Sequence, residues 1–246
     1  MALSGLGLGE RAWFVGATPK GLLTQMEFQH ATYEWLENTG SATLKWGLLG
    51  DWDVSAVKDF SYVFAKNRAK NKNAKSNGEM RLCCFNGGTE KASAFNGDGL
   101  EKWITTSVTS LASTFYISGW SGSSMEANLG NWDVSKVTDL TGTFWGSSRF
   151  TGKGIDRWDT SSVTTLSGTF SSATAMNADL SRWNVAKVTT MTNAFDSTTS
   201  LSSCNKRLIA DAWKSSSVFV ATAYDTDWAA DTCAVRFKRL ETCNEQ

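Results

Sequence analysis

A carboxylate or its amide directly follows four recurring tryptophans of the chain. These residues are Asp53, Asp133, Asp159 and Asn184. If the segments around them stack, the side chains form a row that could bind cations or supply an acid and a base. Stacked like charges are costly unless each is hydrogen-bonded locally. Ser55, Ser135 and Ser161 follow two residues later and suit an Asx turn. We therefore interpret the row as turn-forming, with cation binding and catalysis as the alternatives.

Nucleophilic catalysis finds little support in the sequence. It needs a base beside a serine or cysteine, most often histidine. His30 is the only histidine, and it falls in a segment that we expect to be a capping helix. Cys83 and Cys84 could be a reactive pair, but a loop or buried pair is the simpler interpretation. We expect no catalytic residue, no metal site and no cofactor, and hence no enzyme.

The five cysteines match no zinc-binding spacing, and three of them lie near the carboxyl end, at Cys204, Cys233 and Cys243. A disulfide between Cys204 and Cys233 would close a loop of about 28 residues and stabilise the fold by roughly 3 to 4 kcal/mol. This cysteine usage favours an extracytosolic or organellar setting. The first residues show no signal-peptide pattern.

Eight residues are candidate contacts for a partner. Five are basic: Lys66, Arg68, Lys70, Lys72 and Lys75. A solvated loop is the default interpretation of such a stretch, and docking on an anionic partner is the alternative. The other three are tryptophans outside the repeat pattern described below: Trp120, Trp145 and Trp228. Tryptophan is favoured at the centre of protein interfaces.

Charge and hydropathy argue against nucleic-acid binding and against a membrane-spanning helix. The 246 residues include 24 basic and 24 acidic ones, so the net charge is zero. A net charge of zero removes the electrostatic driving force for non-specific nucleic-acid binding, although it leaves room for a local basic patch. No apolar run approaches the roughly 20 residues of a membrane-spanning helix. We therefore expect other proteins as partners, with no nucleic acid and no membrane span.

A repeated motif explains most of the tryptophans. Five segments align on Trp52, Trp103, Trp132, Trp158 and Trp183. Each has Leu or Ile three residues before the tryptophan and Val five residues after it. A phenylalanine ends each motif twelve residues after the tryptophan, at Phe64, Phe115, Phe144, Phe170 and Phe195. We assign both aromatic sets to the core, because stacked copies can bury the apolar face that one copy cannot.

The period of about 25 to 30 residues predicts a repeat solenoid. The segment from Leu or Ile to Val predicts a short strand. From that Val onward, the apolar residues follow an i, i+3, i+7 spacing, which predicts a short helix. We therefore predict an α/β, leucine-rich-repeat-like solenoid with parallel strands on one side, helices on the other and helical caps.

The chain divides into three parts on this basis. Residues 1–45 form an amino-terminal cap with a helix over about 19–38, where Thr18-Pro19 suits a helix start. Residues 46–203 form the solenoid, and residues 204–246 the carboxyl-terminal cap. Residues from about 65 to 94 are rich in Asn, Lys and Gly. We favour an insertion for them over a degenerate repeat.

The run NWDVSKVTDLTGTF at 131–144 resembles the repeat of BspA-type leucine-rich-repeat surface proteins, also called the mycoplasma lipoprotein-associated repeat. The resemblance covers about residues 46–233, and the segment from Cys204 through Trp213 to Cys233 looks like the ending of algal and protist members. It implies a leucine-rich-repeat-like solenoid that serves in adhesion or protein binding. No catalytic residue comes with it.

These observations predict a non-enzymatic protein-binding repeat module of a surface-adhesion or recognition type. The alternative is a structural accessory subunit of a larger assembly, for which an algal photosynthetic or organellar complex is one setting. A carbohydrate-active or cation-binding solenoid is the remote alternative.

Overall fold

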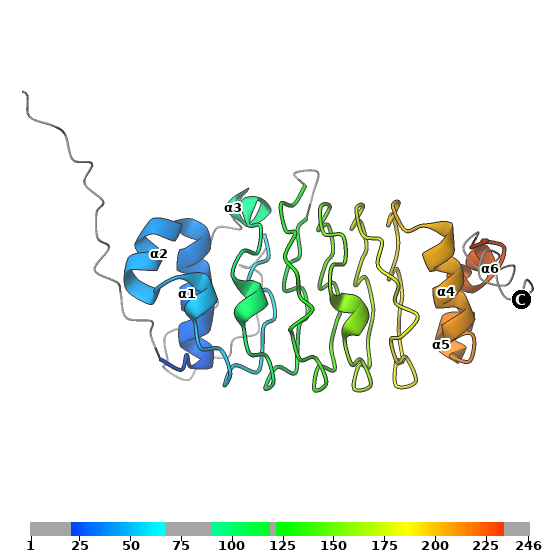
Figure 1. Ribbon diagram of the computed structural model, residues 1–246, viewed down its shortest axis with the longest axis horizontal. Helices are drawn as coiled ribbons and strands as arrows, with labels where there is room; N and C mark the ends of the chain where they lie inside the picture. Colours follow the sequence, from blue (N-terminus) through cyan, green and yellow to red (C-terminus); the bar gives the residue numbers. More distant parts are fainter. Residues whose placement is uncertain (1–20, 67–89, 119–121, 234–246) are drawn as a thin grey trace, which may run out of the picture.

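The computed structural model describes residues 21–66, 90–118 and 122–233. Helices gather at the two ends of this part of the chain, and a row of thin coils joins them (Figure 1). We number the coils 1 to 5 after their tryptophans, which are Trp52, Trp103, Trp132, Trp158 and Trp183. None of the helices in the described part is both long and apolar enough to cross a membrane.

Two helices form the amino-terminal cap, α1 (Gln25–Glu37) and α2 (Thr39–Trp46). The helix expected over about 19–38 begins later, because Thr24 is its N-cap. Thr24 and Glu27 form a capping box, in which each side chain accepts a hydrogen bond from the other residue's backbone N–H. Asn38 ends α1 and caps α2 with its side chain, which produces a second helix that the sequence pattern did not indicate.

Three helices form the opposite cap. They are α4 (Ser203–Trp213), α5 (Ser217–Val220) and α6 (Ala223–Ala229). A disulfide joins Cys204 at the start of α4 to Cys233 beyond α6. Trp213, Phe219 and Trp228 are buried and pack against one another and against Phe195 of coil 5. This cap therefore covers the apolar end of the stack.

The coils contain little regular structure. A single 3₁₀ turn precedes the tryptophan of coils 1, 2 and 4: η1 (Leu49–Asp51), η3 (Leu100–Lys102) and η4 (Ile155–Arg157). One short helix, α3 (Glu90–Ala94), leads into coil 2. Turns and extended residues make up most of the rest.

The predicted α/β solenoid with parallel strands and an opposing layer of helices is wrong. No β-strand occurs among the described residues, and successive coils meet through isolated parallel bridges between single residues. The bridge residues are Asp59, Ser110, Asp139, Thr165 and Thr190. They lie in the segment that was expected to be helical, and the expected strand is replaced by the 3₁₀ turn, an extended tryptophan and an Asx turn.

A recurring left-handed residue explains this outcome. The residue ten positions after each tryptophan has a φ between 54° and 62°, namely Tyr62, Ser113, Gly142, Gly168 and Asn193. Strands and right-handed helices both need negative φ, so such a residue interrupts either one. The apolar spacing alone carries no sign of this backbone conformation.

Backbone hydrogen bonds nevertheless join neighbouring coils at every second residue. Between coils 2 and 3, the N–H groups of Leu111, Ser113, Phe115 and Ile117 donate to the carbonyls of Asp139, Thr141, Thr143 and Trp145 at 2.7 to 3.0 Å. The equivalent bonds occur at the other three interfaces between coils. The ladder satisfies the buried backbone without regular strands.

Aromatic rings fill the interior in two columns. The tryptophans of the five coils are 2 to 4% exposed, and the ring pairs Trp52–Trp103, Trp103–Trp132 and Trp158–Trp183 stack at 6.0 to 6.3 Å. The second column runs through Phe64, Phe115, Phe144, Phe170 and Phe195, with neighbouring centroids 5.5 to 5.7 Å apart. Burying each large ring contributes roughly 1.5 to 3 kcal/mol before ordering entropy.

The tryptophans of coils 2 to 5 donate their indole N–H to a backbone carbonyl of the preceding coil. Trp132 donates to the carbonyl of Leu100 at 2.8 Å, and Trp103, Trp158 and Trp183 donate to the equivalent carbonyls of Leu49, Leu129 and Ile155. Trp52 instead donates to Gly47 at the end of α2. The backbone carbonyl three residues before one tryptophan thus accepts the hydrogen bond from the tryptophan of the next coil. This bond sets the register of the stack.

Coils 1 and 2 are direct neighbours although about 50 residues separate their tryptophans. Asp59 and Ser110 form a bridge, and Phe95, which follows α3, stacks on Phe64 of coil 1 at 4.2 Å. In the described part of the chain, coil 1 therefore contacts coil 2 directly, and the interpretation of residues 65–94 as an insertion stays a prediction.

The indole hydrogen bonds predict a difference between two buried tryptophans. Trp132→Phe removes ring area and the bond to Leu100, so we expect the free energy of unfolding to fall by about 2 to 3 kcal/mol. Trp213→Phe is the matched control, because the Trp213 N–H is buried and has no hydrogen-bond partner among the described residues. Its cost should be about 1 kcal/mol smaller. Urea unfolding at 25 °C measures both, and an equal or larger loss for Trp213→Phe contradicts the role of the bond.

Candidate binding surface

The predicted row of carboxylates is used in local turns. Asp133 accepts hydrogen bonds from the N–H and the hydroxyl of Ser135 at 2.9 and 2.6 Å. These bonds, that from the hydroxyl first, hold the pKa of Asp133 below its usual value. Asp53, Asp159 and Asn184 accept the same backbone bond. In the described part of the chain, no three His, Cys, Asp or Glu residues are grouped to hold a metal ion.

His30 belongs to a polar cluster between α1 and α2. Its Nε2 lies 2.8 Å from Glu34, and Lys45 of α2 binds the same carboxylate at 2.9 Å. Trp46 also donates to Glu34. Burial raises the pKa of Glu34, but the hydrogen bonds from Trp46, Lys45 and His30 outweigh it and lower that pKa to about 2. The cluster joins the two cap helices, so the contact that His30 makes links α1 to α2 through Glu34.

Aromatic side chains are partly exposed on one run of the hydrogen-bonded ladder. Tyr62 of coil 1 is 40% exposed, and the half-buried rings of Tyr116 and Trp145 follow on coils 2 and 3. The Tyr116 and Trp145 rings lie 5.8 Å apart. Tyr62 lies three residues earlier in its coil than Tyr116 and Trp145 do in theirs. We call these three residues the aromatic ledge.

A glycine on the next coil makes room for Trp145. A Cβ placed on Gly168 would lie 2.7 Å from the Trp145 ring, whereas one on Gly142 would be in ordinary contact with Tyr116 at 3.8 Å. The Trp145 ring therefore packs directly on the backbone of coil 4. Both glycines also occupy the left-handed position, which glycine adopts at little cost. One residue type thus serves the turn and the aromatic contact.

A cavity of about 460 Å³ lies beside Trp145. It is lined by Ile117, Gly122, Trp145, Gly146, Ser148, Ser172, Thr174 and Ser197. All of these side chains are uncharged, and four carry hydroxyl groups. We call it the hydroxyl-lined cavity. Because the lining comes from coils 2 to 5, the cavity exists only when the coils stack in register.

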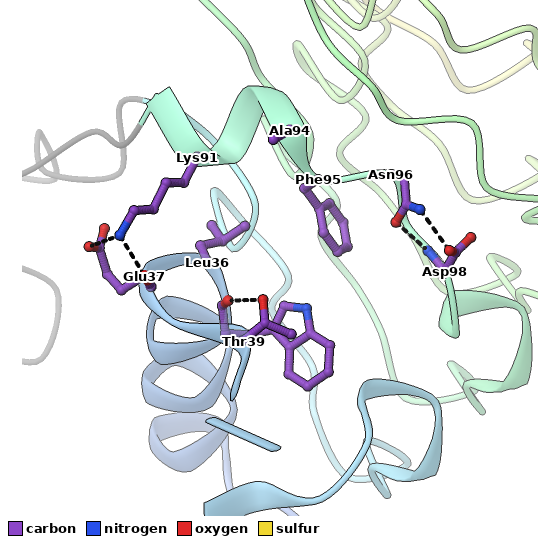
Figure 2. Close-up of a pocket in the computed structure, with 9 residues that line it drawn as sticks. Leu36, Glu37, Thr39, Lys91, Ala94, Phe95, Asn96 and Asp98 are labelled. Atoms are coloured by element: carbon purple, nitrogen blue, oxygen red, sulfur yellow. Dashed lines mark hydrogen bonds and ion pairs between the residues drawn. The ribbon is translucent and has the colours of Figure 1, made fainter. Parts of the chain in front are cut away.

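A second cavity of about 460 Å³ lies between the end of α1 and α3 (Figure 2). Lys91 reaches across to Glu37, 3.2 Å from its Oε2, and also binds its backbone carbonyl. On the other side, Asn96 and Asp98 bond to each other. The buried Oε1 of Glu37 has no partner in the described part of the chain, and the other polar groups named here bond to one another. The contacts tie α3 to the amino-terminal cap.

The structure separates the predicted partner contacts. Trp145 lies on the aromatic ledge, and Lys66 is half-buried at the end of coil 1. Trp228 is 6% exposed and packs on Phe195, so the prediction of an exposed contact is wrong for this residue. It was misassigned because it stands outside the repeat, yet the cap needs its own apolar residues to cover coil 5.

Several predicted residues lie outside the described part of the chain. They are Arg68, Lys70, Lys72, Lys75, Cys83, Cys84, Trp120 and Cys243. The sequence analysis also missed Tyr62 and Tyr116 as surface residues. The sequence could have indicated Tyr62, because it replaces the small residue that stands at the equivalent position of coil 3, Gly142.

Residues 39–120 and 117–227 match a protein family described as a mycoplasma protein of unknown function, DUF285. The two matches cover the five coils together with α2 and α4. No curated protein and no solved structure matches the chain.

The Glu34 cluster predicts a pH-dependent contribution to stability. The pKa of Glu34 is about 2 in the folded chain against an ordinary value of 4.5. Its ionised form therefore stabilises the fold above about pH 4.5, and this contribution is lost as the pH falls towards 2. Glu34→Gln should lower the free energy of unfolding by about 1 kcal/mol at pH 7, a modest value because the carboxylate is partly exposed.

Thermal unfolding of both proteins from pH 7 to pH 2 checks this. Glu126→Gln is the control, since it removes an exposed ion pair with Arg149 and should change stability little. If the difference in unfolding temperature between wild type and Glu34→Gln stays constant down to pH 2, ionised Glu34 does not make this contribution to stability.

Proposed function

This chain belongs to the DUF285 family, and we propose that it is a non-enzymatic repeat module that binds another protein through the aromatic ledge. The observation that carries the proposal is the exposure of Tyr62, with the partial exposure of Tyr116 and Trp145, on a backbone held by hydrogen bonds between coils. Tyrosine and tryptophan are enriched in protein interfaces and supply much of their binding energy. The motif at 131–144 further supports kinship with BspA-type surface proteins.

The ordered backbone of the ledge supports this role. Tyr62 and Tyr116 belong to the ladder through their own backbone, and the Trp145 ring packs against Gly168. A surface whose backbone is already ordered loses less conformational entropy on binding. The absence of a catalytic role is part of the same proposal, and the use of the predicted carboxylates in Asx turns supports it.

Capture of partners from extracts of the source cells tests this function. The full chain carries an affinity tag, and cross-linked partners are quantified by mass spectrometry. Tyr62→Ser combined with Tyr116→Ser should reduce capture of the partner at least about tenfold, because hot-spot truncations cost more than about 1.4 kcal/mol. Ile104→Ser is the matched control, since Ile104 is 61% exposed and apolar but lies outside the ledge.

The control should capture the same proteins as the wild type. Equal capture by all three chains would contradict binding through the ledge. Failure of the wild type to enrich any protein over an untagged sample would contradict the protein-binding module itself.

A structural accessory subunit is the second candidate, and one observation favours it. Four large apolar side chains of the amino-terminal cap are about half exposed or more: Leu22, Met26, Leu44 and Leu48. Exposed apolar groups of this kind mark contact sites in assemblies. A partner recovered in fixed stoichiometry from a native assembly, and released by Leu44→Ser with Leu48→Ser but not by the ledge variant, would favour this candidate.

A further inference from the structure

We propose that the hydroxyl-lined cavity is a binding site for a neutral oligosaccharide, with Trp145 as the surface on which a sugar ring stacks. This site goes beyond the proposed protein contact, because it depends on the cavity next to Trp145 and not on Tyr62. The argument comes from the chemistry of the lining, the position of Trp145 and the repetition of hydroxyls along the stack.

The lining selects a neutral ligand rich in hydroxyl groups. Its side chains carry no charge, so a phosphate, a carboxylate or a cation would lose hydration without gaining an opposite charge. Hydroxyls act both as donors and as acceptors. Among the described residues, no hydrogen bond occupies the hydroxyls of Ser172 and Ser197 or the indole N–H of Trp145. These three groups are free to bond a ligand.

Trp145 supplies the apolar part of the site. Its ring is partly exposed and is held in place by Gly168 and Tyr116. The face of an aromatic ring is electron-rich, and it attracts the electron-poor C–H groups that cover one face of a pyranose. A fixed aromatic ring beside a set of hydroxyls therefore matches both sides of a sugar. A cavity of about 460 Å³ is within the usual range for a small ligand.

The hydroxyls recur from coil to coil, which favours a chain of sugars over a single one. Ser172 and Ser197 occupy the position of Gly146 on the next two coils, all with φ between 57° and 70°. Thr174 donates to the carbonyl of Ser148, and Thr199 donates to that of Thr174. The cavity thus continues as a row of equivalent polar positions along the stack.

Calorimetry with the full chain tests the site. The probes are cellohexaose, laminarihexaose and mannohexaose, with hexagalacturonate as the charged counterpart. We expect the wild type to bind at least one neutral hexasaccharide and not hexagalacturonate. Trp145→Ala should weaken the binding by about three- to tenfold, which is the range for loss of one aromatic contact.

Two further variants separate binding from folding. Ser172→Asn places a larger side chain in the cavity at φ 58°, a conformation that Asn tolerates, and should abolish saccharide binding while the thermal unfolding curve stays close to wild type. Tyr62→Ser should leave saccharide binding unchanged.

The proposal is overturned if no neutral hexasaccharide binds the wild type, if only hexagalacturonate binds, or if Trp145→Ala and Ser172→Asn bind as tightly as wild type. Loss of protein capture with Ser172→Asn, without any saccharide binding, would make the cavity part of the protein contact and also overturn it. Saccharide binding by a chain that captures no protein would instead leave this site standing while the proposed function fails.

Discussion

A buried indole N–H is costly to leave unpaired, and the tryptophans of coils 2 to 5 each find an acceptor on the preceding coil. The carbonyl three residues before one tryptophan accepts the bond from the next tryptophan, over distances of 2.8 to 3.0 Å in four successive cases. A coil therefore cannot satisfy its own tryptophan. Leaving the N–H unpaired would cost about 1 to 3 kcal/mol for each coil, so the bond fixes both the neighbour and the register.

The register in turn allows a backbone that is neither strand nor helix. A left-handed residue interrupts each coil, yet every second N–H of the following segment reaches a carbonyl of the next coil. The cost of the left-handed residues that are not glycine, such as Ser113 and Asn193, is offset by the ladder and by the phenylalanine column. The stack is rigid because its coils are bonded to one another and not because each is regular.

Surface chemistry depends on the same register. The Trp145 ring packs on Gly168 of the following coil, and the cavity beside it is lined by residues as distant in sequence as Ile117 and Ser197. The ledge and the cavity share one ring, so protein binding and saccharide binding would act on the same face. The side chains of Asp133 and Asp159 are used in local Asx turns, as the sequence predicted.

The sequence alone determined which residues are interior, because five copies of one apolar spacing leave few other ways to bury so many rings. It also assigned the carboxylates to Asx turns, since that motif needs only residues two apart. Only the tertiary structure decided that the coils are neither strands nor helices. Apolar spacing reports which side chains face inward, whereas the sign of φ at Tyr62 or Asn193 is set by the bonds to the next coil. For the same reason the burial of Trp228 could not be predicted, because it depends on the residues that a neighbouring segment places beside it.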